Sequence, residues 1–113
     1  MTLPSAYVEL MSEKGFSLSE RFGIADIALR REDALAAADM LLQAGRVILG
    51  GDVYFKYGGG LSLAYAFWST DRNDKELFED YVARAHAHTI SYITQFLEST
   101  DYEALFSLVT PST

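Results

Sequence analysis

Cysteine is absent from this 113-residue sequence, and proline occurs only twice, at Pro4 and Pro111. The absence of cysteine excludes disulfides, thiolate zinc sites and cysteine nucleophiles, and it is typical of a reducing compartment. Because neither proline lies in the interior, the sequence shows no proline-rich linker and no boundary between domains. We therefore predict a single domain over residues 1–113.

Long hydrophobic runs are also missing. The strongest apolar segments, such as residues 35–42 and 53–57, are too short to span a membrane, and the first residues do not resemble a signal peptide. Half of the residues are nevertheless apolar, and seven Phe, seven Tyr and one Trp supply bulky side chains. This composition predicts a packed, cytoplasmic protein with no membrane partner.

Basic residues are few, nine against sixteen acids, and the formal net charge is −7. The excess is concentrated in residues 57–113, which contain eight acids and three bases. A negative surface repels phosphate backbones and anionic lipid, so we do not expect nucleic acid as a partner. The same surface attracts a basic protein, although a charge of this size also serves solubility alone.

The clearest local pattern is a hairpin. A strand over residues 52–57 leads into Gly58-Gly59-Gly60, where the absence of Cβ atoms permits a tight turn. The returning strand, residues 61–68, alternates bulky and small side chains. Its bulky face consists of Leu61, Leu63, Tyr65 and Phe67. Before the hairpin, Gly50-Gly51 indicates a bulge or a close approach of backbones.

Helices are predicted on both sides of the hairpin. The first begins at Pro4 and ends at Gly15, and the second covers residues 30–44. A long helix with an apolar stripe continues to residue 96, and its N-cap is either Asn73 or Asp74.

Two segments are less regular. Residues 24–29 suit a short strand or the start of the helix that follows, and residues 102–109 suit a half-buried terminal helix. Together the elements predict an α+β fold, in which a small antiparallel sheet is built on a central hairpin and helices pack on one side.

No pattern of catalytic or cofactor-binding residues emerges. His86 and His88 are two apart on the long helix, so their side chains point about 200° away from each other and cannot bind one metal. His88 lies on the apolar stripe and is predicted to pack in the core, whereas His86 is predicted to be solvated. The glycine pairs match neither phosphate-binding nor dinucleotide-binding motifs. We predict no catalytic residue, no metal and no cofactor.

Several polar and aromatic residues are candidates for contacts with a partner. Acids crowd the entry to the long helix, where they either complement the helix dipole or form a patch for a basic protein. Asp52 either caps the glycine pair or presents a carboxylate at the sheet, and Trp68 is either a core residue or a binding hot spot. The candidate set is Asp52, Tyr65, Trp68, Asp71, Asp74, Glu76 and Glu79.

The order of these features resembles a bacterial family, immunity protein 40. The resemblance rests on Gly50-Gly51-Asp52-Val53-Tyr54, on the single Trp68 after the hairpin, and on Tyr81-Val82-Ala83-Arg84 in the long helix. It covers roughly residues 24–97. Phe67 and Ala85 depart from the family pattern as we know it, where these positions tend to be polar and hydroxylated. The resemblance implies a cytoplasmic antidote that binds a toxin protein and masks its active site.

Three hypotheses follow. In the first, the protein is a non-enzymatic immunity protein whose carboxylates and aromatic rings bind a toxin with a basic surface. In the second, it is a small carboxylate-based enzyme or ligand-binding domain, which requires a deep cavity with convergent acids. In the third, it is an adaptor that forms a homodimer through an exposed strand edge.

Overall fold

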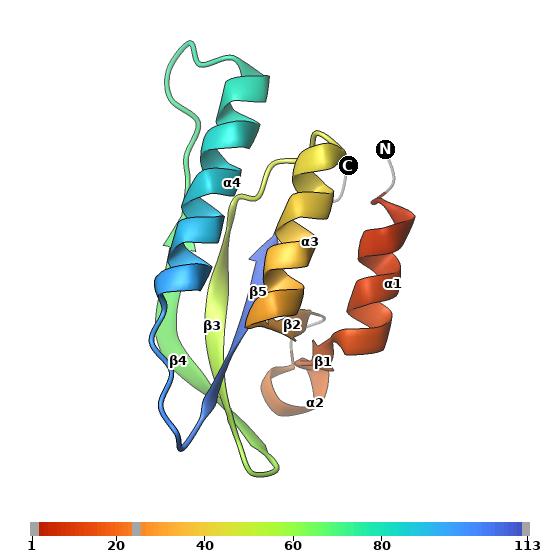
Figure 1. The fold of residues 1–113 in the computed structure, drawn as a ribbon, viewed down its shortest axis with the longest axis vertical. Coiled ribbons are helices and arrows are strands. Elements are labelled where there is room, and N and C mark those ends of the chain that lie inside the picture. Colours follow the sequence, from red (N-terminus) through yellow and green to blue (C-terminus); the bar gives the residue numbers. More distant parts are fainter. Residues whose placement is uncertain (1–2, 24–25, 112–113) are drawn as a thin grey trace.

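The computed structural model describes residues 3–23 and 26–111 (Figure 1). These residues form a five-stranded antiparallel sheet with three long helices on one face, which confirms the predicted α+β class. The strand order is β1-β2-β5-β3-β4. The helices are α1 (Ser5–Lys14), α2 (Ser19–Phe22), α3 (Arg31–Gln43) and α4 (Phe78–Gln95). The strands are β1 (Phe16–Ser17), β2 (Ile27–Arg30), β3 (Gly50–Tyr57), β4 (Gly60–Ser69) and β5 (Glu103–Val109).

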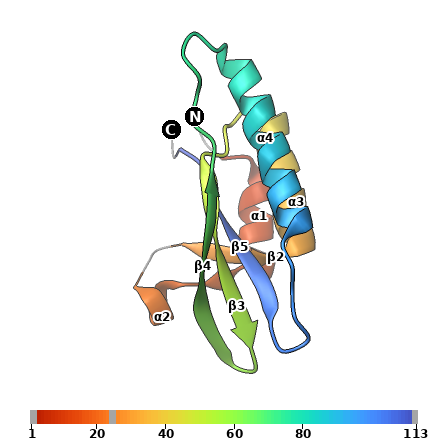
Figure 2. The same cartoon turned by 90° about the vertical axis from the view of Figure 1, so that its left-hand side faces the viewer.

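The two faces of the sheet are covered unequally (Figure 2). Helices α1, α3 and α4 lie on one face, which we call the helical face, and only the single turn of α2 lies on the other, which we call the open face. None of the helices that the structure describes is long and apolar enough to cross a membrane.

The main core fills the space between the sheet and the three long helices. Alternate residues of the central strands point into it, and alanines on the inner side of α3 allow this helix to approach the sheet closely. Burial of each large aliphatic or aromatic side chain contributes about 1.5–3 kcal/mol. Its large side chains with an exposure of 1% or less are Leu29, Leu41, Ile48, Val53, Ile93 and Phe106.

A second, smaller core lies on the open face, beneath α2. Tyr54 of β3 packs there with Leu18 and Leu105, and the ring of Phe22 lies 5.3 Å from that of Tyr54. This cluster covers one part of the open face and leaves the region around Asp52 exposed. The exposed part of the open face therefore ends where this cluster begins.

Strand β5 is the central strand of the sheet, so the prediction of a helix over residues 102–109 is wrong. Its residue Phe106 is paired with Leu29 of β2 on one side and with Val53 of β3 on the other. Leu105 and Ser107 are buried on the open face, whereas Phe106 and Leu108 are buried on the helical face. A strand that is buried on both faces loses its period-two pattern, which is why the sequence resembled a buried helix.

The predicted hairpin is confirmed, and so is the close approach at the glycine pair. Strands β3 and β4 are joined at Gly58-Gly59, where Gly58 has a φ of +55°. At Gly51, a Cβ atom would lie 2.2 Å from the Ser107 carbonyl oxygen and 2.3 Å from the Trp68 ring. Glycine is required at this position because the backbone of β5 and the indole occupy the space of a side chain.

Two predicted element boundaries change. The ambiguous segment 24–29 contains a strand, β2, and its residues 24 and 25 lie outside the described residues. Helix α4 begins at Phe78, with Leu77 at the N-cap position and no side-chain cap, so neither Asn73 nor Asp74 is the cap. Asn73 lies in the loop before the helix, where its backbone N–H donates to the Glu76 carboxylate at 2.9 Å.

Candidate protein-binding face

Strand β4 has a bulge at its centre. Val53 of β3 lies opposite three residues of β4, residues 64–66. The middle residue, Tyr65, has a φ of +56°, in the left-handed region that bulky residues rarely adopt. Because two extra residues preserve the alternation of side chains, Leu63 and Phe67 on either side of the bulge point to the same face.

This shared face is the open face, where the bulky side chains of β4 meet solvent. Tyr65 is 89% exposed, Phe67 is 68% exposed and Leu63 is 41% exposed. The small residues between them face the helical core. The predicted alternation is therefore confirmed, with its aromatic side outward. Isolated exposed apolar residues are common, but three neighbours around a bulge form a contiguous surface.

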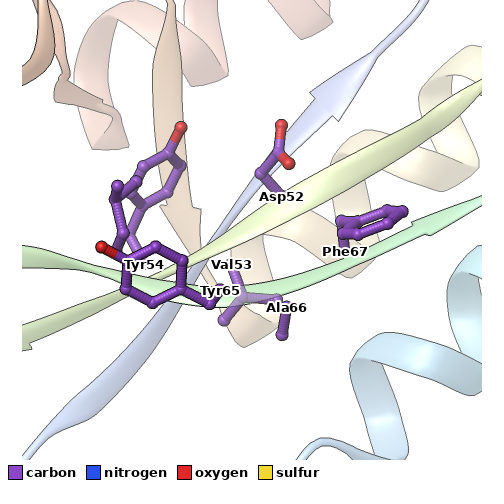
Figure 3. A pocket seen from close by; sticks show the side chains of 7 residues that line it. Asp52, Val53, Tyr54, Tyr65, Ala66 and Phe67 are labelled. Atoms are coloured by element: carbon purple, nitrogen blue, oxygen red, sulfur yellow. The ribbon is translucent and has the colours of Figure 1, made fainter.

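Asp52 of β3 lies beside these rings, in a shallow cleft of about 270 Å³ (Figure 3). Its side chain and that of Tyr54 rise from the same side of β3, whereas Val53 points to the opposite side. Asp52 is exposed and forms no ion pair with any side chain that the structure describes. We call Asp52, Leu63, Tyr65 and Phe67 the open-face patch.

A second carboxylate adds to the negative potential of this region. Asp26, directly before β2, accepts a hydrogen bond from the Ile27 backbone N–H at 2.8 Å. Burial raises the pKa of Asp26, the bond from Ile27 lowers it in part, and the negative charge of Asp52 raises it further. Burial likewise raises the pKa of the Tyr54 hydroxyl, and Asp52 and Asp26 add to that effect. A bound cation would relieve this repulsion.

Ser107 lies next to Asp52 and is paired with it between β5 and β3. Its side chain is fully buried beside the Tyr54 hydroxyl, and its interaction with that hydroxyl lowers the Tyr54 pKa in part, against the larger effect of burial. Ser107 therefore belongs to the small core on the open face and is not accessible to a partner.

The acids at the entry to α4 form a separate group, in the loop that extends beyond the end of the sheet in Figure 1. Asp71, Asp74 and Glu79 are exposed. Glu76 instead braces the loop: the Arg84 guanidinium donates to both its carboxylate oxygens, at 2.8 and 2.9 Å. These bonds and the bond from Asn73 lower the pKa of Glu76 to about 2.

Trp68 lies in the core. Its indole is 4% exposed, its Nε1–H donates to Thr89 Oγ1 at 3.0 Å, and its ring stacks on Tyr92 with 4.8 Å between centroids. These contacts attach β4 to α4. Trp68 thus holds the strand in place from the helical face, and it has almost no surface to offer a partner.

The two histidines exchange the environments predicted for them. His88 is exposed, with its Nδ1 atom 2.6 Å from Thr70 Oγ1. His86 is partly buried and pairs with Asp39 of α3 at 2.7 Å. The apolar stripe of the sequence predicted which side of α4 is buried, but it did not locate the edge of that side exactly. His88 lies just outside the buried side. No group of three or more potential metal ligands occurs within the described parts of the chain.

The structure therefore brings together two of the seven candidate residues, Asp52 and Tyr65, and places four others on or beside the loop before α4. Leu63 and Phe67 complete the open-face patch and were not among the candidates. One feature of the sequence could have identified these two residues. β4 has bulky residues on one face and alanines on the other, which is typical of a strand whose alanine face packs closely under a helix and whose bulky face points away from it.

The fold and this surface define a small α+β protein with an aromatic and acidic sheet face that its own helices leave open. The chain belongs to the immunity protein 40 family, whose sequence model matches residues 17–110. The match confirms the resemblance seen in the Gly-Gly-Asp motif and Trp68. A search of curated proteins and a search of solved structures gave no match.

Proposed function

We propose that this protein binds a cognate bacterial toxin in the cytoplasm and neutralises it by masking its active site. The family supports the general function. The observation that carries the proposal for this chain is the open-face patch, in which an unpaired carboxylate is surrounded by apolar side chains up to 89% exposed. Exposed aromatic residues are enriched at the energetic centre of protein interfaces, and a carboxylate among them selects a partner of opposite charge.

The candidate residues take different roles in this proposal. Asp52 and Tyr65 contact the toxin directly, and Trp68 holds β4 in position from the core side. Asp71, Asp74 and Glu79 steer a basic toxin surface toward the protein, because exposed charges chiefly raise association rates. Glu76 contributes through the brace to Arg84, which fixes the loop that carries these acids.

The test is co-expression with the protein encoded by the neighbouring gene. We expect that protein to arrest growth when it is expressed alone, and the immunity protein to restore growth and to co-purify with it. A control co-expresses Trp68→Ala, whose core is expected to be destabilised by about 3–5 kcal/mol and which should therefore protect less well. A neighbour that is neither toxic nor bound would refute the proposal.

The alternatives have weaker support. The enzyme hypothesis needs convergent acids in a deep cavity, and the cleft at the open-face patch is shallow and contains one carboxylate, Asp52. The homodimer hypothesis needs a regular strand edge, and β4 is an edge strand interrupted by its central bulge. Light scattering over a range of concentrations tests for the dimer directly.

A further inference from the structure

The open-face patch combines features that specify the chemistry of what it binds. Its carboxylate, Asp52, has no cationic partner among the side chains that the structure describes. The negative charge of Asp52 also raises the pKa of the Asp26 carboxyl, so the two carboxyl groups lie close enough to repel each other. The missing complement is therefore a cation.

The aromatic rings narrow the choice of cation. Phe67 lies directly opposite Asp52 in the register of β3 and β4, Tyr65 precedes it by two residues in the bulge, and both rings are exposed to solvent (Figure 3). A planar guanidinium stacks on such rings and pairs with a carboxylate through two parallel bonds, whereas an ammonium group acts as a compact, strongly hydrated point charge. The patch therefore fits arginine better than lysine.

The backbone of Tyr65 supports a binding role over a folding role. The residue adopts a left-handed conformation at φ +56°, and its ring is almost fully exposed. A glycine would adopt this conformation without strain, so the fold gains nothing from a tyrosine here. Strained residues of this kind cluster at functional sites, and the bulge presents this ring to solvent.

We propose that the open-face patch is the docking site for an arginine side chain of the toxin, whose guanidinium pairs with Asp52 between the rings of Tyr65 and Phe67. This inference rests on the proposed function and deepens it by naming the anchor residue of the partner. The bulge also argues against a second copy as occupant, because it breaks the strand edge that sheet extension needs.

The first experiment measures the affinity of purified variants for the protein encoded by the neighbouring gene. Asp52→Asn removes the charge at constant shape, and Tyr65→Gly removes the ring; each is expected to weaken binding by about 30-fold or more. The control for the charge is Glu9→Gln, at an exposed acid of α1 on the helical face, which is expected to change affinity less than about threefold. Tyr65→Phe keeps the ring and is expected to bind more tightly than Tyr65→Gly.

The second experiment identifies the arginine. Each surface arginine of the toxin is changed to lysine and measured against the wild-type protein and against Asp52→Asn. We expect one variant to weaken binding to the wild-type protein by about tenfold and binding to Asp52→Asn by less than about threefold. Circular dichroism verifies that each variant is folded.

The outcomes separate the two proposals. If the wild-type protein neutralises the toxin and Asp52→Asn and Tyr65→Gly do so equally well, the arginine site is wrong and the immunity function stands. The arginine site is also wrong if no toxin arginine shows this coupling, or if the protein alone is a dimer that Tyr65→Gly dissociates. If the wild-type protein neither binds nor protects, both proposals fail.

Discussion

Phe67 and Trp68 are neighbours in β4 and belong to the same chemical class, yet they lie in opposite environments. Phe67 is 68% exposed on the open face, and Trp68 is 4% exposed on the helical face. On the helical face the side chains are matched to α4 by stacking and by a hydrogen bond. On the open face no part of the described chain covers the rings of the patch.

This comparison shows that the alternating side chains of β4 have two different roles, one on each face of the sheet. Residues that point to the helices fix the fold, and residues that point away are free to change with the partner. A substitution on one side of β4 should therefore affect stability, and a substitution on the other side should affect binding. The following measurements test this division, from the largest expected effect to the smallest.

Replacement of Trp68 by alanine should destabilise the protein by about 3–5 kcal/mol, because it empties a large core volume and leaves Thr89 without its indole donor. The free energy of unfolding is measured by urea denaturation followed by circular dichroism. The control is Phe67→Ala, which is expected to change this free energy by no more than about 0.5 kcal/mol. Equal losses in the two variants would break the division between the faces.

Replacement of Gly51 by alanine should cost about 1–3 kcal/mol, because the added methyl group would collide with the Ser107 carbonyl oxygen of β5. The control is Gly59→Ala in the hairpin turn, where a Cβ atom meets open space. Thermal unfolding of both variants separates a requirement for glycine in packing from a general preference for glycine. Equal melting temperatures would contradict the close approach seen here.

Replacement of Tyr65 should show that its conformation is costly to the fold. Both Tyr65→Gly and Tyr65→Ala remove the ring, but only glycine adopts a φ of +56° freely. We therefore expect the glycine variant to be more stable than the alanine variant by about 1 kcal/mol, as measured by urea denaturation. An alanine variant of equal or greater stability would show that the bulge is not strained at this residue.

Asp26 should give the smallest effect, and that effect should depend on pH. Because burial raises the pKa of this carboxyl group in the folded state, its contribution to stability is present below its unfolded pKa and is lost as pH rises through the folded pKa. Asp26→Asn keeps an acceptor for the Ile27 N–H. We expect the variant to exceed the wild-type melting temperature at neutral pH and to match it at about pH 3. A variant that becomes relatively less stable with rising pH would contradict this sign.

The hairpin was predictable because its information is local. Glycines mark the turn, and the period-two pattern of β4 shows which residues share a face. The same pattern cannot show which face the helices cover, since that depends on contacts with residues far along the chain, such as Trp68 with Thr89 and Tyr92. The direction of Tyr65 was therefore open until the layers were known.

Strand β5 was not predictable for the opposite reason. A central strand is apolar on both sides, so its pattern resembles that of a buried helix, and only its partners in β2 and β3 identify it. The candidate site shows the same limit. Asp52 was selected as an unusual acid in a strand, but its neighbours across the sheet, Ser107 and Asp26, came from segments whose sheet positions the sequence did not reveal.

The position of β5 also has a consequence for how the protein is made. Strands β2 and β3 do not pair with each other, because β5 (residues 103–109) lies between them. β5 pairs with Leu29 of β2 and Val53 of β3, which are much earlier in the chain. During translation, the sheet remains in two separate parts until the ribosome has released this segment. A nascent or truncated chain that lacks residues 103–109 could form neither the main core nor the sheet that positions Asp52. Protection against the toxin would therefore begin only after β5 has been synthesised.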